Sequence, residues 1–414
     1  MGGQSMWATV LDSILSKLIV EGELDVTYPD GHTHRYGPGG APVAAVQIHD
    51  TATIQALCRY PEIGFGEAYM DGTLTTDGSS LMDVMKLAVR NSYAGKMPGW
   101  TRVLERLRYG FRKIVMRNTA RRSRANVAHH YDISDALYRL FLDKDMQYSC
   151  AYFTHPDIAL EDAQIAKKNH IARKLCIEPG MRVLDIGCGW GGMALTLSRD
   201  YGAHVTGVTL SQNQLATAQG RAAKAGLSAQ TEFRLQDYRA LDQKFDRIVS
   251  VGMLEHVGAP HFQEYFDKVG DLLAPDGISL IHTIGRNGPP TTQSPWLNKY
   301  IFPGGYVPSL EELVIPVGKA GLWNLDIESW RLHYAMTLRH WLQRFDRQLP
   351  RVREMYDERF IRMWRFYLIA CIMVFEEADQ CVFQLQLGHK RDAAPLTRDY
   401  LYDQPDVFQQ KAAE

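Results

Sequence analysis

The chain has 414 residues, more than a single hydrophobic core usually supports, so we expect one large domain and a smaller one. Lys and Arg number 46 against 47 for Asp and Glu, a balance that gives no sign of nucleic-acid binding. Six cysteines without a CxxC pair, and no recognisable signal peptide, are typical of reduced thiols in the cytoplasm. The longest apolar run, 366–375, is too short to span a bilayer, so any membrane contact is expected to be peripheral.

The first hundred residues predict a small α+β domain. Between residues 6 and 20, apolar side chains recur at helical spacing, which predicts an amphipathic opening helix. The stretch 28–40 is rich in Gly, Pro and His, which indicates turns between short strands. Helical patterns then continue to about residue 95.

Residues 101–125 form a strongly basic second zone. Between Arg102 and Arg124 the chain carries eight arginines and one lysine against a single acid, Glu105. Apolar residues recur there at helical spacing: Leu104, Leu107, Phe111, Ile114 and Val115. The pattern predicts a basic amphipathic helix that links the first zone to the rest of the chain.

Residues 126–402 alternate strand and helix patterns, which predicts an α/β domain with a mainly parallel sheet, followed by a tail at 403–414. Within it, "VLDIGCGWGG" (183–192) predicts a buried strand that glycines turn into a helix starting near Gly191. Gly187, Gly189 and Gly192 satisfy the GxGxxG pattern of dinucleotide sites. The second strand, 204–211, ends without the acid that such sites use to bind a ribose.

Asp185 further indicates which ligand the glycine-rich loop binds. A pyrophosphate beside this carboxylate would be repelled, whereas a sulfonium and an ammonium would be attracted. S-adenosylmethionine carries both cations, and NAD carries neither. We interpret Cys188 as a small residue that fills the loop rather than as a nucleophile.

The following elements fit the same nucleotide. Ser211 and Gln214 form a capping-box pattern, so a helix is predicted to start there. Thr209 and Gln214 are candidates for the ribose contacts. After a third strand at 231–237, Asp237 offers an acceptor and Tyr238 an aromatic face for the adenine, although a surface turn is the alternative.

Several further motifs resemble one enzyme family. They are "HHYDISDALYRLFLDKDMQYSCAYF" (129–153), "VTLSQNQ" (208–214), "VGMLEHVG" (251–258), "IHTIGRN" (281–287), "NKYIFPGGYVPS" (298–309) and "HYAMTLRHW" (333–341). Together with the glycine-rich loop they resemble the cyclopropane-fatty-acyl-phospholipid synthase family, relatives of the mycolic-acid cyclopropane synthases. Residues 64–74 resemble the small N-terminal domain of the phospholipid-modifying members. The implied fold is α/β and class I methyltransferase-like, with a seven-stranded, mostly parallel sheet, helices on both faces and a small N-terminal domain.

The resemblance implies that a methylene from S-adenosylmethionine is added across a cis double bond of a phospholipid acyl chain. A bound bicarbonate ion is implied as the base that deprotonates the carbocation. The implied anion site comprises Cys150, Glu255, His282, Ile284 and Tyr334. Backbone N–H groups of Cys150 and Ile284, the His282 ring and the Tyr334 hydroxyl would donate to the anion, and Glu255 would accept its hydroxyl proton. Glu255 and His282 follow the fourth and fifth predicted strands, so both should face the same crevice as the glycine-rich loop.

The remaining implied site residues belong to the catalytic and cofactor sites. Tyr131 is expected to face the developing cation, and Cys371 matches a cysteine traditionally proposed as catalytic. The predicted cofactor contacts are Tyr148, Ser149, Val183, Leu184, Asp185, Ile186, Gly187, Cys188, Gly189, Gly191, Thr209, Leu210, Ser211, Gln214, Tyr238 and Arg239. No metal is predicted.

Two other functions remain open. One is a methyltransferase that makes methyl- or methylene-branched acyl chains, or methylates an amine, although an amine nucleophile would not need the anion site. The other is an inactive lipid- or cofactor-binding protein. We expect a cytoplasmic enzyme, peripherally bound to the inner face of the membrane. The basic segment would contact anionic headgroups or act only as a linker, and the N-terminal domain would present lipid or support a homodimer.

Overall fold

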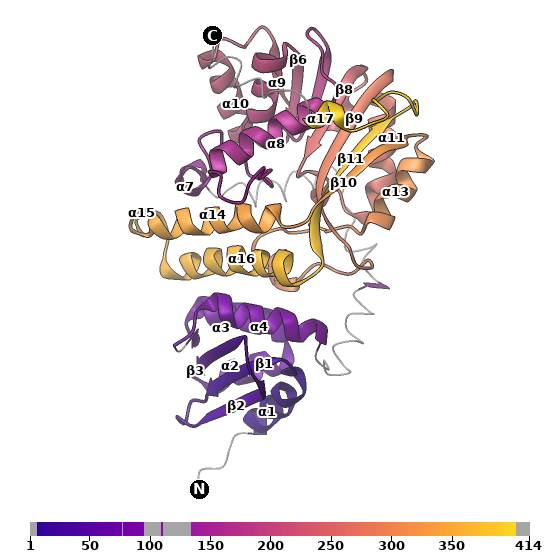
Figure 1. Ribbon diagram of the computed structural model, residues 1–414. Coiled ribbons are helices and arrows are strands. Elements are labelled where there is room, and N and C mark those ends of the chain that lie inside the picture. Colours follow the sequence, from indigo (N-terminus) through magenta and orange to yellow (C-terminus); the bar gives the residue numbers. More distant parts are fainter. Residues whose placement is uncertain (1–5, 77, 95–108, 111–133, 403–414) are drawn as a thin grey trace. The chain divides into compact units, whose positions relative to one another are not determined.

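The computed structural model describes residues 6–76, 78–94, 109–110 and 134–402 (Figure 1). Contacts divide the chain into two compact units. The first comprises 1–112, 291–303 and 338–379, and the second comprises 113–290, 304–337 and 380–414. Residues 291–303 and 338–379 were predicted to belong to the catalytic domain, but they group with the N-terminal residues. The predicted domains, which follow one another along the chain, do not include this arrangement. The predicted linker and tail lie almost wholly outside the described residues.

The first unit contains a four-stranded sheet with helices. Strand order is β2-β1-β3-β4, with β1 parallel to β3 and the other pairs antiparallel. The strands are β1 (Gly22–Thr27), β2 (Thr33–Gly39), β3 (Val43–Ile48) and β4 (Leu74–Thr76). The N-terminal helices are α1 (Met6–Leu18), α2 (Thr51–Arg59), α3 (Pro61–Asp71) and α4 (Leu81–Ala94). Helix α1 confirms the amphipathic opening helix, and its Leu11 packs into the core of this unit.

The later segments of the first unit are helical. They include α12 (Pro295–Tyr300), most of α14 (His333–Arg347), α15 (Leu349–Met355) and α16 (Glu358–Glu377). Helix α16 contains the apolar run 366–375. Among the described residues, no helix combines the length and the apolar character needed to cross a membrane.

The second unit is built on a seven-stranded sheet in the order β10-β11-β9-β8-β5-β6-β7. The strands are β5 (Arg182–Ile186), β6 (His204–Thr209), β7 (Thr231–Leu235), β8 (Phe245–Val251), β9 (Leu273–Arg286), β10 (Trp323–Trp330) and β11 (Gln380–Gly388). Neighbours from β7 to β9 pair in parallel, and β11 pairs antiparallel with β9 and β10. The predicted seven-stranded, mostly parallel sheet is confirmed.

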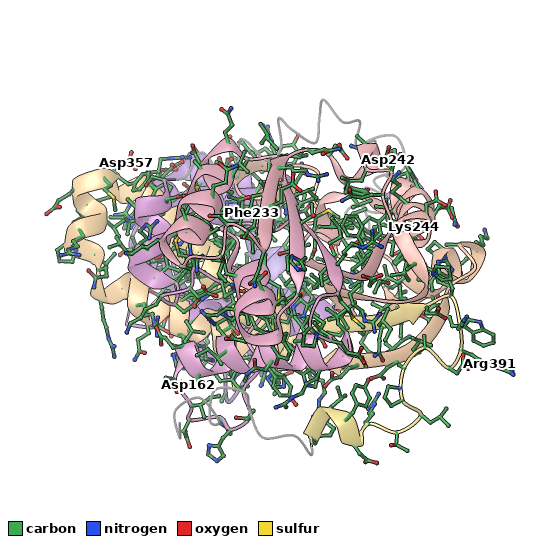
Figure 2. All side chains as sticks on the ribbon, turned by 90° about the horizontal axis from the view of Figure 1, so that it is seen from above. Asp162, Phe233, Asp242, Lys244, Asp357 and Arg391 are labelled. Atoms are coloured by element: carbon green, nitrogen blue, oxygen red, sulfur yellow. The ribbon has the colours of Figure 1, made fainter. Side chains whose placement is uncertain are left out.

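Helices cover both faces of this sheet, because successive strand residues point to opposite sides. In β5, Leu184 joins a core cluster with α11 (Phe262–Leu272) and α13 (Leu310–Lys319), while Val183 joins a second cluster. The second cluster is built with α8 (Leu160–Lys174), α9 (Gly192–Tyr201) and α10 (Gln212–Lys224). Phe233 belongs to this second cluster, whereas Asp242 and Lys244 are exposed at the surface of the unit (Figure 2). The short helices α7 (Asp135–Phe141) and α17 (Asp399–Tyr402) complete the unit.

The chain order places a crevice at one sheet edge. From β5 the chain runs outward through β6 and β7, and then returns to β8 on the other side of β5. Ligands of such sheets bind outside the carboxyl ends of the strands at this switch point. Gly191 allows the tight turn there: its φ is +83°, and a Cβ would lie 2.9 Å from the Phe233 ring. Only glycine meets both conditions without strain.

Candidate functional site

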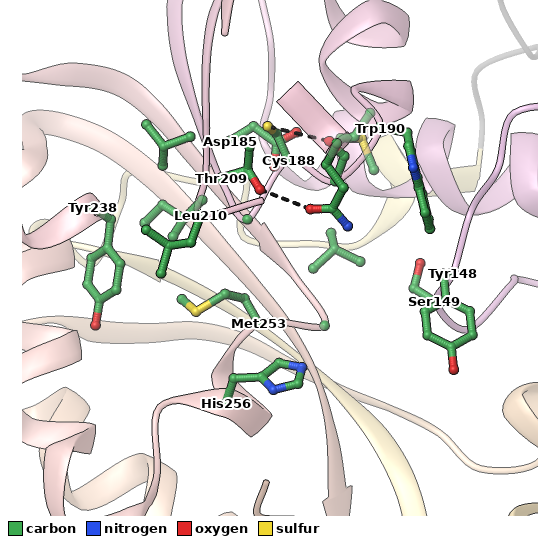
Figure 3. Close-up of a pocket in the computed structure, with 18 of the residues that line it drawn as sticks. Tyr148, Ser149, Asp185, Cys188, Trp190, Thr209, Leu210, Tyr238, Met253 and His256 are labelled. Carbon is green, nitrogen blue, oxygen red and sulfur yellow. Dashed lines mark hydrogen bonds between the residues drawn. The ribbon is translucent and has the colours of Figure 1, made fainter. Parts of the chain in front are cut away.

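A pocket opens at the carboxyl ends of β5, β6, β7 and β8 (Figure 3). Most of the predicted cofactor residues line it: Tyr148, Ser149, Asp185, Ile186, Gly187, Cys188, Gly189, Thr209, Leu210, Gln214, Tyr238 and Arg239. Four predicted contacts are not in its lining, namely Val183, Leu184, Gly191 and Ser211. The first two are buried in the sheet core, and the last two shape the starts of α9 and α10.

Asp185 is a buried acidic residue in the lining of this pocket. Its side chain is only 2% exposed, and its Oδ2 atom makes no hydrogen bond with the described residues. Burial raises the pKa of the Asp185 carboxyl to about 7, while the nearby Lys167 acts in the opposite direction. A desolvated carboxylate with an unused acceptor is stabilised by a cationic ligand, so Asp185 suits a ligand with a sulfonium or an ammonium group.

The middle of the pocket is formed by the start of α10. Ser211 caps this helix, and its side chain accepts a hydrogen bond from the Gln214 backbone N–H, as the capping-box pattern predicts. The Thr209 hydroxyl donates to Gln214 Oε1 over 2.9 Å. This bond joins the two side chains that are predicted to contact the ribose, and Figure 3 shows Thr209 near Asp185.

Tyr238 and Arg239 form one end of the pocket. Asp237 also lies there, but its carboxylate accepts hydrogen bonds from Arg239 Nε at 2.9 Å and Nη2 at 2.7 Å. The Asp237 carboxylate is thus paired with the neighbouring guanidinium, and its predicted contact with the adenine stays a prediction. The Tyr238 ring remains available as an aromatic face, and burial raises the pKa of its hydroxyl.

Glu255 and Ile284 of the predicted anion site are in direct contact. Glu255 lies in a short 3-10 turn after β8, and its Oε1 accepts a 2.6 Å hydrogen bond from the Ile284 N–H. The predicted donation of this N–H to an anion is therefore replaced here by donation to Glu255. The Glu255 Oε2 atom is buried and makes no hydrogen bond with the described residues, and burial raises the pKa of the carboxyl to about 7.

His282 lies on β9, two residues before Ile284, and is 2% exposed. Its Nδ1 is 3.1 Å from Nε2 of Gln384, the residue opposite it on β11. The edge of its ring contacts Trp330, with centroids 5.1 Å apart. Burial holds the pKa of His282 well below its usual range, so the ring is neutral.

The segment that contains Cys150 packs against the start of α14, where Tyr334 lies. The backbone N–H of Ala151 donates to the Thr337 hydroxyl over 3.0 Å. Cys150 and Tyr334 are both buried, and burial raises the pKa of the Cys150 thiol. The structure thus places both predicted residues in the same unit as Glu255 and His282.

For two further predicted catalytic residues, Tyr131 and Cys371, the structure gives no position relative to this group. Tyr131 lies outside the described residues. Cys371 lies on α16 and belongs to the first compact unit, whereas the pocket belongs to the second. Burial raises the pKa of the Cys371 thiol to about 12, so it stays protonated and is a poor nucleophile at neutral pH.

Several pocket residues were not predicted from the sequence. They are Met146, Gln147, Trp190, Gly192, Met193, Val208, Gln236, Val251, Gly252, Met253, His256, Val257 and His261. Trp190 and Gly192 stand within the quoted glycine-rich motif, so that motif could have indicated them. His256 stands within the quoted motif 251–258, so that motif could have indicated it, whereas His261 lies outside every quoted motif. Burial lowers the pKa of His256 to about 4, so this pocket histidine is neutral.

Comparison with known proteins agrees with this geometry. The sequence model of a family described as Mycolic acid cyclopropane synthetase matches residues 118–385, and a domain of unknown function matches residues 10–95. The chain belongs to the mycolic acid cyclopropane synthetase family. Its predicted family, fold class and status as an S-adenosylmethionine-dependent enzyme are confirmed.

Individual members of this family resemble the chain to different extents. The cyclopropane-fatty-acyl-phospholipid synthase of Escherichia coli (strain K12) is 36% identical over 87% of this chain and 94% of its own length. The "Probable fatty acid methyltransferase" of Pseudomonas putida is 41% identical over 61% of this chain and 66% of its own length. The solved structure of mycolic acid cyclopropane synthase CmaA1 complexed with SAH and CTAB is 33% identical, with a TM-score of 0.61 over 64% of this chain and 97% of that one.

Proposed function

We propose that this enzyme adds a methylene from S-adenosylmethionine across a cis double bond of an unsaturated phospholipid acyl chain, giving a cyclopropane fatty acid. Glu255 carries the proposal, because a buried carboxyl group with an unused oxygen is unusual unless it has a partner in the reaction. A methyltransferase that acts on a stronger nucleophile would not need such a group. The names of the relatives support a lipid acyl chain as the acceptor.

Methyl transfer needs an aligned and dry site, because an alkene is a weak nucleophile. Asp185 in the lining of the pocket would hold the cationic donor, and Thr209 with Gln214 would hold its ribose. The C–S bond to the methyl group breaks as a C–C bond forms to one alkene carbon, which leaves a carbocation on the other carbon. The ring closes when the new methyl group loses a proton.

The chemistry of the predicted anion-site residues suits an anion that accepts this proton. Glu255 Oε2 can accept a hydroxyl hydrogen from the anion. When Gln384 Nε2 donates to Nδ1 of His282, the ring proton is on Nε2, which can donate to the anion. The Tyr334 hydroxyl is a second candidate donor. A bicarbonate ion held by these groups would supply the general base, typically worth about 10²–10⁴-fold in rate.

Isotope labelling tests the proposal. The protein is expressed in a host without cyclopropane lipids, and purified enzyme is given S-adenosylmethionine with a fully deuterated methyl group and unsaturated phospholipid vesicles. The product should retain two deuterons, and its deuterium NMR spectrum should show them at the upfield position of a ring methylene. Added bicarbonate should raise the rate of a bicarbonate-depleted preparation.

The main alternative is a branched-chain product, which the 41% identity to a probable fatty acid methyltransferase favours. A methyl branch formed by reduction of the cation would keep three deuterons. A methylene branch would keep two, but its deuterium NMR spectrum would show them at a vinyl position and not at a ring position. Either product would overturn the cyclopropane proposal while keeping the same donor.

Access to the substrate would involve the basic segment 101–124. Its side chains lie almost wholly outside the described residues, so we propose its membrane contact from the sequence alone. Each Lys or Arg near an anionic surface adds about 1 kcal/mol of binding free energy. The predicted peripheral location at the cytoplasmic face and the homodimer stay predictions.

A further inference from the structure

A buried lysine stands directly behind one end of the pocket. Lys167 lies on α8, and its side chain is 0% exposed. Its Nζ donates to Gln147 Oε1 over 2.7 Å and to the Ser149 hydroxyl oxygen over 2.8 Å. Gln147 and Ser149 both line the pocket, but Lys167 does not. Lys167 is thus separated from the pocket interior by the two side chains that it binds.

Helix α8 also holds the backbone of this pocket wall. Gln164 Nε2 donates to the Ser149 carbonyl over 3.0 Å and more weakly to the Gln147 carbonyl over 3.4 Å. The neighbouring Lys168 pairs with Asp145 at 2.6 Å. The backbone of residues 147–149 is therefore held by Gln164. The bonds from Lys167 to the Gln147 and Ser149 side chains are additional to these backbone bonds.

The bond from Lys167 determines what Ser149 can do. An ammonium only donates, so the Ser149 oxygen must accept from it. The hydroxyl hydrogen is then left to donate to another acceptor, and an ammonium behind the hydroxyl makes that donation stronger. An acceptor in the pocket, above all an anionic one, is the matching partner.

Asp185 and Lys167 are two groups of opposite charge near the pocket. The described part of the chain shows no ion pair to Lys167 and no hydrogen bond to Asp185 Oδ2. Burial lowers the pKa of Lys167 to about 7, and the carboxylates of Asp143 and Asp145 act against this. At the other end, marked by Tyr238 in Figure 3, the Arg239 charge is already neutralised by Asp237. Among the described residues, Lys167 thus stands without an ion pair at the Ser149 end, and Asp185 lies between the two ends (Figure 3).

We propose that Lys167 positions the carboxylate of the methionine portion of S-adenosylmethionine, acting through Ser149 and Gln147. The methionine portion carries an ammonium and a carboxylate on one carbon, and Asp185 and Lys167 match these two charges in sign. This inference rests on the proposed use of S-adenosylmethionine at the pocket. It adds a positioning residue that does not touch the ligand.

Removal of the ligand carboxylate provides a direct test. Calorimetry would measure the binding of S-adenosylhomocysteine and of its decarboxylated analogue to the wild type, to Lys167→Met and to Lys168→Met. We expect Lys167→Met to weaken S-adenosylhomocysteine at least tenfold but to change the affinity for the decarboxylated analogue less than twofold. Lys168→Met is the matched control, because its partner Asp145 does not line the pocket. It should not discriminate between the two ligands.

A second variant covers the case in which Lys167→Met does not fold. Ser149→Ala removes the intermediate hydroxyl and should give the same selective loss. In steady-state assays, either variant should raise the KM for S-adenosylmethionine much more than it lowers kcat. Equal weakening of both ligands, or no weakening of either, would overturn the inference and leave Lys167 a structural residue. Failure of the wild type to bind either ligand would instead overturn the proposed function, and this inference with it.

Discussion

Replacing Asp185 with Asn should make the ligand-free protein more stable and the donor binding weaker. The carboxyl has a pKa of about 7 in the folded protein against an ordinary value of 3.8, a difference of about 3 units. Because folding raises the pKa of the Asp185 carboxyl, this group contributes most to the free energy of unfolding below pH 3.8, where it is protonated in both states. The contribution is lost as the pH rises from 3.8 to 7, because the carboxyl ionises in the unfolded chain before it ionises in the folded protein. At pH 8 the ionised group therefore costs about 4 kcal/mol, and at pH 5 about 1–2 kcal/mol.

The Asn variant does not titrate, so its gain in unfolding free energy over the wild type should be about 2–3 kcal/mol larger at pH 8 than at pH 5. The difference between the two pH values cancels the constant cost of burying an amide. Removing one partner of a buried charge pair costs about 2–5 kcal/mol of binding, or about 30-fold to several thousand-fold in affinity for S-adenosylmethionine.

Urea unfolding at the two pH values and calorimetric titration with S-adenosylmethionine measure both effects. Asp242→Asn is the control, because this aspartate is exposed on the same unit and should change neither quantity. An Asn variant with affinity within threefold of the wild type would refute the role of Asp185. A stability change that is the same at pH 5 and pH 8 would refute the pKa argument.

The remaining predictions concern other residues. Gly192→Ala would place a Cβ 2.2 Å from Gln147 Nε2, so we expect at least a tenfold loss of S-adenosylmethionine affinity by calorimetry; Gly220→Ala, where nothing lies within 4 Å, is the control and should bind normally. Glu255→Gln should lower kcat about 10²–10⁴-fold with nearly unchanged donor affinity. In the wild type kcat should rise with pH through about 7 as Glu255 ionises, and the variant should lose this rise. Cys371→Ala should keep at least half of the wild-type activity, since a thiol with a pKa of about 12 is protonated at neutral pH; a loss of more than tenfold would restore a catalytic role. Replacing Arg112, Lys113, Arg121 and Arg122 with Gln should weaken sedimentation with anionic vesicles and flatten its salt dependence, and unchanged binding would leave the segment a linker.

The sheet and its glycine-rich loop were predictable because their signals are local. A short apolar run followed by glycines specifies a buried strand and a tight turn within ten residues, and Asp185 within it indicates the charge of the ligand. The Ser211 cap was equally visible, because a cap and its partner lie three residues apart. Features of this kind depend on neighbouring residues and hardly on the rest of the fold.

The role of Lys167 was not predictable from sequence. A lysine in a helix usually lies at the solvated surface, and the partners of Lys167 lie 18 and 20 residues away. This limit is set by the distance between the bonded partners along the chain. It also applies to segment 338–379, because its grouping with the N-terminal residues depends on contacts between distant parts of the chain.

The position of β11 has a consequence for synthesis on the ribosome. This strand lies between β9 and β10, yet it follows the segment 338–379 in the chain. Until residue 388 has emerged, β9 has an open edge and β10 has no partner in the sheet. Nascent chains that stop in α16 would therefore expose an unpaired hydrophobic edge, which is a template for aggregation. Such chains should be held by chaperones until β11 inserts and closes the sheet.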